Sequence, residues 1–410
     1  MIRMVRKGAV VASASLAVCL AAAACSSSSS SSPSSGSSSS SSASSSSGAT
    51  VSISVAQFDR TLSAMSVLKP LTAAGKGNVA VILPDTVSSA RYTQFDAPYL
   101  TEALTKAGLT SSQFTVQNAQ GSDATELSDA QTAITKGASV LIMDPLDSGV
   151  GAQIESYAKA HGVGVVDYDR LTLGGSRAYY VSFNNVLVGT KIGQGFTACA
   201  AAWHVAKPNV LVMKGAPTDN NATLFAQGYD AVLKPFFSSG KYVQVGSAAG
   251  TWDPPTALSE FQQQFTAHKS INSVLTPNDE NAAPIIHYLQ TKGVKAKTFP
   301  VTGQDATTVG LQNILSGYQC GTVYKPIYLE AQAAVALAMF IRANKTPPSS
   351  LVNGTTQDSK ANVAVPSVLL QPTWVTTTNM ASTVIADKFV TVGQLCVGQY
   401  ATLCKTAGIS

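Results

Sequence analysis

Short apolar runs alternate with helix-forming windows from Asn78 to Tyr324, and this alternation constrains the fold more than any other feature of the sequence. Continuous apolar strands, each followed by an amphipathic helix, are typical of parallel sheets covered on both faces. The expected strands are 78–84, 114–117, 139–144, 162–169 and 179–183, and then 209–213, 242–245, 273–275, 299–302 and 321–324. Because the pattern restarts at about residue 209, we expect two doubly wound α/β domains.

The N-terminus has the form of an export signal. Arg3, Arg6 and Lys7 precede an apolar stretch over residues 9–24 that is too short and too rich in alanine for a transmembrane helix. We expect residues 1–24 to be a signal peptide and Cys25 to carry the acyl chains of a bacterial lipoprotein. Ordinary secretion, with cleavage at an Ala-x-Ala site, is the alternative, because alanine stands three residues before Cys25 where leucine is usual.

Serine fills most of residues 25–50. A segment without apolar side chains cannot offset its ordering entropy, so we expect a disordered tether, whose glycosylation the sequence leaves open. Residues 51–77 form a segment before the first domain. Its Phe58, Leu62, Met65 and Leu68 have the spacing of one helical face and are expected to pack on that domain.

The mature chain is close to neutral. Charged residues make up 12% of the sequence and the formal charge is +5, of which three positive charges belong to the signal. No basic stripe indicates nucleic acid as a partner.

Cysteine usage fits an oxidising compartment. Besides Cys25 and a cysteine in the signal, the sequence has Cys199, Cys320, Cys396 and Cys404. Four cysteines allow three pairings. We favour Cys396 with Cys404, which closes a short loop and leaves Cys199 for Cys320; free buried thiols are the alternative.

Polar residues cluster where the expected strands end, which is where parallel sheets bind ligands. They are Asp85, Asp169, Arg170, Asn184, Asn185, Asp279 and Asp305. The sequence lacks a nucleophile elbow, a Walker loop, a dinucleotide fingerprint and a zinc-protease motif, and its four histidines are scattered. We therefore expect a binding protein without a metal site or cofactor, and not an enzyme.

Six strings occur in one order along the chain: Tyr168-Asp169-Arg170, the segment 180–185 (YVSFNN), Asp219-Asn220-Asn221-Ala222, Pro277-Asn278-Asp279, Gly303-Gln304-Asp305-Ala306 and the segment 323–326 (VYKP). In their order and spacing they resemble the periplasmic D-xylose-binding proteins, of the type I substrate-binding family, over nearly all of residues 78–390. The resemblance implies two lobes joined by three crossover strands, near Asn184, Tyr324 and Leu369. The N-terminal lobe would comprise 78–184 and 326–364, and the C-terminal lobe 185–325 and 365–410.

The resemblance also implies a set of sugar contacts: Arg91, Tyr92, Asp169, Arg170, Asp219, Asn221, Trp252, Asn278, Asp305 and Lys325. Tyr92 departs from the family pattern, which has tryptophan, so one stacking face is smaller and gains a hydroxyl. This departure leaves the exact sugar open.

Each residue also has a structural alternative. Asp169 and Arg170 would form a loop salt bridge, and Trp252 would pack on the surface. Asp219 or Asn221, and likewise Asp305, would cap a helix. Lys325 would be a solvated hinge residue, and Arg91 with Tyr92 a plain helix start.

The resulting prediction is an exported, monomeric receptor that is anchored to the membrane by lipid and captures a monosaccharide, D-xylose first among them. It would deliver the sugar to an ABC permease and its ATPase. A sensory receptor that presents sugar to a chemoreceptor or kinase is the main alternative. A DNA-binding repressor would need a helix pair where the export signal stands, and a secreted glycosidase has no supporting motif.

Overall fold

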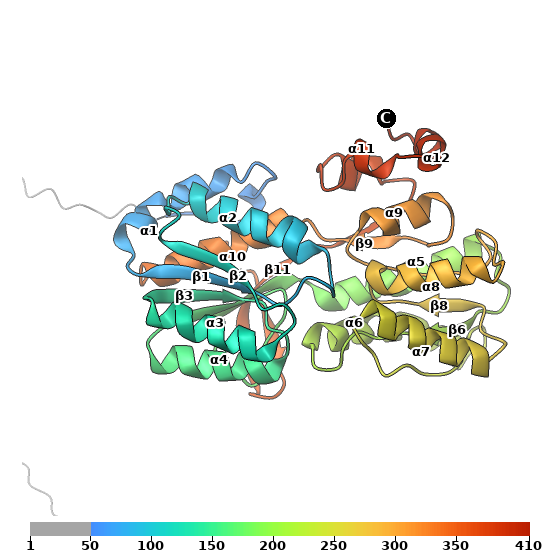
Figure 1. The fold of residues 1–410 in the computed structure, drawn as a ribbon, viewed down its shortest axis with the longest axis horizontal. Coiled ribbons are helices and arrows are strands. Elements are labelled where there is room, and N and C mark those ends of the chain that lie inside the picture. Colours follow the sequence, from blue (N-terminus) through green and yellow to red (C-terminus); the bar gives the residue numbers. More distant parts are fainter. Residues whose placement is uncertain (1–50) are drawn as a thin grey trace, which may run out of the picture. The chain divides into compact units, whose positions relative to one another are not determined.

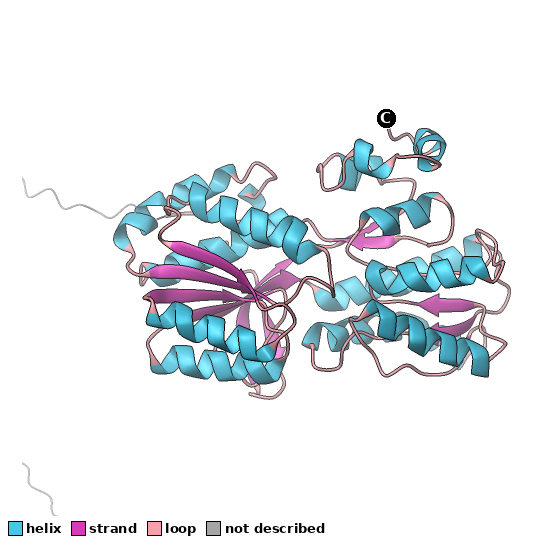
Figure 2. Ribbon diagram, viewed as in Figure 1, coloured by secondary structure: helices cyan, strands magenta, loops and turns pink. Residues whose placement is uncertain are grey.

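The computed structural model describes residues 51–410. The expected signal peptide, the expected lipidation of Cys25 and the whole serine tether lie outside the described residues and stay predictions. The described residues belong to one compact unit, in which helices cover a seven-stranded sheet and two smaller sheets (Figures 1 and 2).

The first lobe is built on a seven-stranded sheet with strand order β10-β11-β5-β4-β3-β1-β2. Its strands are β1 (Asn78–Leu83), β2 (Phe114–Asn118), β3 (Ala138–Met143), β4 (Gly164–Tyr168), β5 (Tyr179–Phe183), β10 (Gly354–Asp358) and β11 (Val363–Leu370). Every neighbouring pair is parallel except β10 with β11. The five strands expected from the sequence are therefore present, each within two residues of its expected bounds.

Alternate residues of the central strands face two separate cores. Val79, Val81 and Leu83 point to the face covered by α2 (Ala97–Lys106) and α10 (Ile327–Arg342). Ala80 and Ile82 point to the opposite face, under α3 (Asp123–Thr135) and α4 (Ser148–Ala160). Burial on both faces explains why these strands read as continuous apolar runs.

Residues 51–77 pack on this lobe, as their spacing predicts. The segment forms two short 3-10 turns, Val55–Gln57 and Ser63–Leu68, and helix α1 (Lys69–Ala74), and it contacts α2 and α10. The four side chains expected to share one helical face, Phe58, Leu62, Met65 and Leu68, are buried in the core of the lobe. Gln332 Nε2 on α10 donates to the carbonyl oxygen of Asp59 at 2.9 Å. The segment therefore belongs to the folded lobe, although it is not one continuous helix.

The second lobe contains a shorter sheet. Its core is the parallel set β7 (Val243–Gln244), β6 (Asn209–Val212) and β8 (Ser273–Leu275). The expected strand 299–302 is reduced to a bridge at Val301 that pairs with Val274, and a further bridge joins Gln304 to Val323 in β9 (Thr322–Tyr324). β12 (Thr373–Val375) pairs antiparallel with β9.

Seven helices are described in this lobe: α5 (Asn185–Ala202), α6 (Asn220–Ser238), α7 (Pro254–Ala267), α8 (Asp279–Thr291), α9 (Thr308–Leu315), α11 (Val392–Leu395) and α12 (Tyr400–Thr406). Helices α5 and α6 approach closely at Gly189, where an added Cβ would lie 2.0 Å from the carbonyl oxygen of Phe225. Glycine at this position therefore lets the two backbones meet. None of the helices in residues 51–410 combines the length and apolarity needed to cross a bilayer.

The chain crosses between the lobes three times, after β5, after β9 and after β11. These points agree with the expected crossovers near Asn184, Tyr324 and Leu369. The expected lobe boundary at residue 364 is wrong, because β11 pairs in parallel with β5 as far as Leu370 and buries Val365, Val368 and Leu370 in the first lobe. The boundary lies after Leu370.

Both expected disulfides are present. Cys199 on α5 pairs with Cys320 just before β9, and Cys396 pairs with Cys404 near the C-terminus. The free-thiol alternative is therefore wrong for these four cysteines.

Candidate functional site

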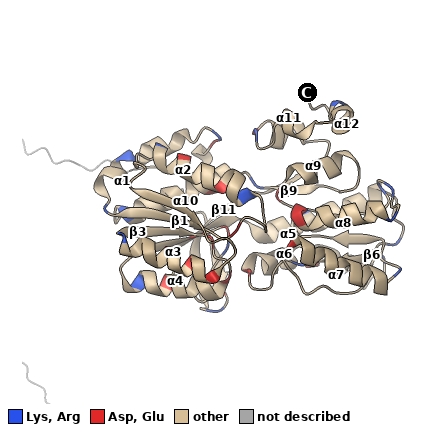
Figure 3. Ribbon diagram, in the orientation of Figure 1, with Lys and Arg blue, Asp and Glu red and all other residues tan. Residues whose placement is uncertain are grey.

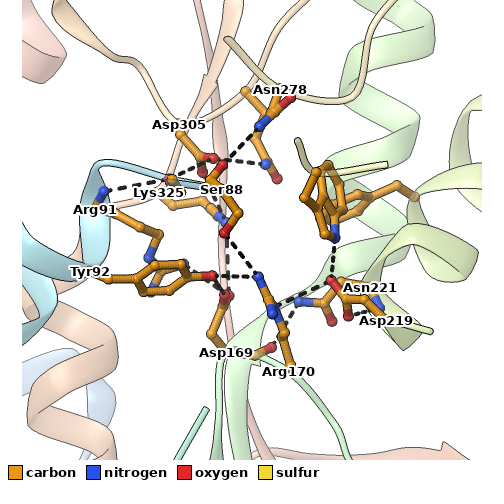
Figure 4. Close-up of a pocket in the computed structure, with 14 residues that line it drawn as sticks. Ser88, Arg91, Tyr92, Asp169, Arg170, Asp219, Asn221, Asn278, Asp305 and Lys325 are labelled. Carbon is orange, nitrogen blue, oxygen red and sulfur yellow. Dashed lines mark hydrogen bonds and ion pairs between the residues drawn. The ribbon is translucent and has the colours of Figure 1, made fainter. Parts of the chain in front are cut away.

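All ten residues expected to contact the ligand surround one cavity between the lobes (Figure 4). The space enclosed by its lining, including the opening to solvent, is about 330 Å³. The lining residues are Ser88, Ser89, Arg91, Tyr92, Asp169, Arg170, Asp219, Asn221, Phe225, Trp252, Asn278, Gln304, Asp305 and Lys325. Segments more than two hundred residues apart in the sequence thus form one site.

Strand ends position most of these side chains. Asp169 and Arg170 directly follow β4, and Lys325 directly follows β9. Asp219 and Asn278 are the N-caps of α6 and α8 and accept from backbone N–H groups of the first turn. The cavity therefore lies at the carboxyl ends of the strands of both sheets.

Asp169 lies at the centre of the charge network. Its backbone is left-handed, with φ +56°, and its carbonyl oxygen accepts from Tyr180 Oη at 2.8 Å and Asn221 Nδ2 at 3.0 Å. Its carboxylate lies 2.9 Å from Arg91 Nη1 and 3.9 Å from Lys325 Nζ. Burial alone would raise the pKa of Asp169, but these cations outweigh it and lower the pKa. The residue is therefore an ionised acceptor.

Arg91 is buried among three carboxylates. Its Nε and Nη2 donate to both oxygens of Asp96, at 2.9 and 2.7 Å, and Nη2 also donates to Glu330 at 2.5 Å. Its Nη1 pairs with Asp169 Oδ1 at 2.9 Å and has no other acceptor among the described residues. Nη1 of Arg91 can therefore also donate to a ligand, while the contacts with Asp96 and Glu330 hold the guanidinium in position.

Tyr92 and Arg170 form a joined pair on the first-lobe wall. Arg170 Nη2 donates to Tyr92 Oη at 3.0 Å and lies near Ser88 Oγ at 3.4 Å. Arg170 Nε lies 3.7 Å from Asp144 and 3.5 Å from Asp219, so it contacts carboxylates of both lobes. The hydroxyl of Tyr92, the departure noted in the sequence, is thereby engaged by a neighbouring side chain.

The opposite wall is aromatic. Trp252 Nε1 donates to Asp219 Oδ2 at 3.0 Å, and the indole meets the ring of Phe225 edge to face at 6.4 Å. Gly215 makes room for the indole, since a Cβ there would lie 2.1 Å from Trp252 Cζ2. Trp252 therefore lines the cavity and does not simply pack on the surface.

Asn221 is held by protein partners. Its Oδ1 accepts from Asn185 Nδ2 at 2.7 Å, and its Nδ2 is the group that donates to Asp169. The side chain ties the start of α6 to the end of β4, so Asn221 acts mainly in joining the lobes.

Asp305 and Lys325 form the remaining charged pair, at 3.1 Å, with both side chains buried. Asp305 also has a left-handed backbone, with φ +88°. Such strained positions in non-glycine residues are common at functional sites.

Several structural alternatives are wrong. Asp169 and Arg170 do not form a salt bridge with each other, because Asp169 pairs with Arg91 and Arg170 with Asp219. Lys325 is only 4% exposed and so is not a solvated hinge residue. Asp305 does not cap α9, since Thr307 does. The capping alternative holds for Asp219, which caps α6 and lines the cavity at once.

Four lining residues were not predicted: Ser88, Ser89, Phe225 and Gln304. Phe225 lies one helical turn after Asn221 on α6, and that spacing could have identified it. Gln304 lies within the Gly303-Gln304-Asp305 string, and its Oε1 has no hydrogen-bond partner among residues 51–410. Gln304 is thus an acceptor available to a ligand.

No group of three or more histidine, cysteine or acidic side chains within residues 51–410 has the arrangement of a metal site. The positive groups at the cavity, Arg91, Arg170 and Lys325, each lie beside a carboxylate. Figure 3 likewise shows positive and negative positions interspersed along the ribbon. The cavity therefore suits an uncharged ligand with several hydroxyl groups.

Comparison with known proteins agrees with this geometry. Residues 79–346 match a family model described as a periplasmic binding protein domain. The D-xylose-binding periplasmic protein of Escherichia coli K12 is 35% identical over 277 residues, which cover 67% of this chain and 80% of that protein. The multiple sugar-binding periplasmic receptor ChvE of Rhizobium radiobacter is 29% identical, over 80% of this chain and 94% of that protein.

A solved structure is similar as well. It is a carbohydrate transporter solute binding protein from Chloroflexus aurantiacus in complex with D-glucose, with a TM-score of 0.69 and 28% identity over 77% of this chain and 97% of that one.

Proposed function

This chain belongs to the periplasmic binding protein family, and from that premise we propose that it captures a monosaccharide outside the cytoplasm and delivers it to an ABC importer. It is a solute-binding protein and not an enzyme. D-xylose is the first candidate ligand, because the relatives named above include a D-xylose-binding protein at 35% identity. D-glucose is the second, because a similar protein was solved with it.

The observation that carries the proposal is the convergence of paired charges and aromatic rings from both lobes on one small cavity. A pyranose has a hydroxyl edge that needs fixed donors and acceptors, and C–H faces that need flat apolar partners. Carboxylates such as Asp169 and Asp305 accept from hydroxyls, while Arg91 and Lys325 donate to them. Trp252 offers a face for the ring.

Selectivity would come from polar atoms that a wrong epimer leaves unpaired in the closed cavity. Each buried group left without a partner costs about 1–3 kcal/mol. Gln304 Oε1 has no hydrogen-bond partner among the described residues, and Asp169 Oδ1 and Asp305 Oδ1 have only their ion pairs with Arg91 and Lys325. These three oxygens are the candidates for this selectivity. The hydroxyl of Tyr92, which the tryptophan of the family pattern lacks, would change which sugars the cavity accepts.

Attachment through Cys25 completes the proposal. A lipidated cysteine followed by a serine tether would keep the two lobes at the outer face of the membrane, within reach of the permease.

Uptake of labelled sugar tests the transport role. Cells that lack the protein are expected to lose high-affinity uptake of ¹⁴C-D-xylose or ¹⁴C-D-glucose. The wild-type gene would restore uptake, and a gene with Asp169→Asn would not. Unchanged uptake of every sugar that the purified protein binds would contradict the transport role.

A further inference from the structure

Glu280 joins the two lobes beside the cavity without lining it. It is the second residue of α8 in the second lobe. Its Oε1 accepts from Ser89 Oγ at 3.0 Å and from the backbone N–H of Ala90 at 3.1 Å, both in the loop after β1 in the first lobe. Its Oε2 accepts from Asn278 Nδ2 at 3.1 Å. One carboxyl group thus holds two cavity residues, Ser89 and Asn278, from opposite lobes.

The charged groups around Glu280 are mostly acidic. Asp279 on its own helix and Asp305 from the neighbouring loop both act on it. The cation of this region, Lys325, is paired with Asp305 at 3.1 Å. On the first-lobe side, the guanidinium of Arg91 is turned toward Asp96, Glu330 and Asp169. Glu280 therefore has no cation of its own among the described residues. Burial, assisted by the charges of Asp305 and Asp279, raises the pKa of Glu280 from 4.5 to about 8.

We propose that Glu280 is a positioning residue that clasps the lobes over the bound sugar, and that this clasp makes closure depend on pH. The proposal rests on the proposed function, since it assumes that the closed cavity is the form that holds the ligand. Separation of the lobes removes Ser89 and Ala90 from Glu280 and returns its carboxylate to water.

The sign of the pH effect follows from the two states. In the open form Glu280 ionises near its ordinary pKa, and in the closed form it holds its proton up to about pH 8. Between these two pKa values, closure of the lobes is accompanied by protonation of Glu280, so a lower pH favours the closed form. One such group changes affinity by at most about tenfold per pH unit.

Calorimetric titration with D-xylose and D-glucose at pH 5, 6, 7 and 8 tests the clasp. The wild-type affinity is expected to fall about tenfold or more between pH 6 and pH 8. Glu280→Gln keeps an acceptor oxygen for Ser89 and Ala90 and cannot ionise. This variant should bind like the wild type at pH 5 and more tightly than the wild type at pH 8.

Glu102→Gln is the matched control, because Glu102 is exposed on α2, where it pairs with Lys106. It should keep the wild-type pH profile. A Glu280→Gln variant that loses affinity equally at every pH would overturn the pH-dependent clasp and leave Glu280 a purely structural contact.

A measurement without sugar separates this inference from the proposed function. Small-angle X-ray scattering of the sugar-free protein should show a smaller radius of gyration at pH 5 than at pH 8, with no such change in Glu280→Gln. Equal changes in both proteins, or none in the wild type, would overturn the clasp even if no sugar bound at all.

Discussion

Two clusters of buried charges stand out within residues 51–410, and one of the two surrounds a cavity with contributions from both lobes. The other lies entirely within the first lobe, where Arg177 Nη2 pairs with Asp358 at 2.5 Å and Nε lies 3.7 Å from Glu155. Asp358 also accepts from the backbone N–H groups of Gly174, Lys360 and Ala361. This cluster ties β10 to the loop before β5.

The two clusters differ in how far the protein itself provides partners for their charged groups. Asp358 is satisfied by backbone N–H groups and by Arg177 of its own lobe. Asp169 Oδ1, Arg91 Nη1 and Asp305 Oδ1 have ion pairs but no further partner among the described residues, and they line the cavity. Glu155 Oε1 of the other cluster also has no hydrogen bond there, but Glu155 does not line the cavity. Buried charge alone therefore does not identify a binding site. Spare donors and acceptors that face a cavity between two lobes do.

The largest effect that separates the clusters should come from Arg177→Met. It leaves Asp358 without its cationic partner, which costs about 3–5 kcal/mol of unfolding free energy. Denaturant unfolding measures this loss. Sugar affinity of the folded variant should not change, and a weaker affinity would mean that the two clusters are coupled.

Asp169→Asn should instead lower the sugar affinity more than the stability of the fold. Loss of the charge removes an acceptor for sugar hydroxyls while Arg91 keeps Asp96 and Glu330, so affinity should weaken by about 2–4 kcal/mol with a smaller change in stability. Calorimetry and unfolding report the two quantities. Asp358→Asn is the matched control, expected to alter stability and leave affinity intact.

Trp252→Ala should weaken sugar binding by about 1–2 kcal/mol, because the ring of the sugar loses its apolar partner. Trp203, the C-cap residue of α5, provides the control. Equal affinity losses in Trp252→Ala and Trp203→Ala, measured by calorimetry, would argue against stacking on Trp252.

Tyr92→Phe should give the smallest change. The substitution deletes the hydroxyl that accepts from Arg170, which should weaken sugar binding by about 0.5–1.5 kcal/mol. A panel of sugars titrated against the variant would show whether this hydroxyl sets selectivity. If every affinity fell by the same factor, it would serve only to position Arg170.

The sequence predicted the elements that follow its strongest patterns. The strands of the first sheet from Asn78 to Phe183 carry continuous apolar runs and were found within two residues. β10 was missed because its sequence, Gly354 to Asp358, is polar and lies at the edge of the sheet. The strand expected at 299–302 is only a bridge, since apolar composition does not fix how many ladder bonds form.

The family resemblance predicted ten of the residues that line the cavity, but not the contacts that these residues make with one another and with the rest of the protein. Each of the ten expected residues lines the cavity. The contact of Arg91 with Glu330 joins residues 239 apart, and the contact of Glu280 with Ser89 joins residues 191 apart. Only the fold brings such pairs together, and no local pattern indicates them.

The most direct test of this account is a calorimetric titration of the purified protein with D-xylose, D-glucose, D-ribose, L-arabinose and D-galactose. We expect one-to-one binding of at least one of these neutral sugars, weakened by about 2–4 kcal/mol in Asp169→Asn and unchanged in Asp358→Asn. If none of the five bound, or if Asp169→Asn bound the sugar as tightly as the wild type, the cavity between the lobes would not be a monosaccharide site.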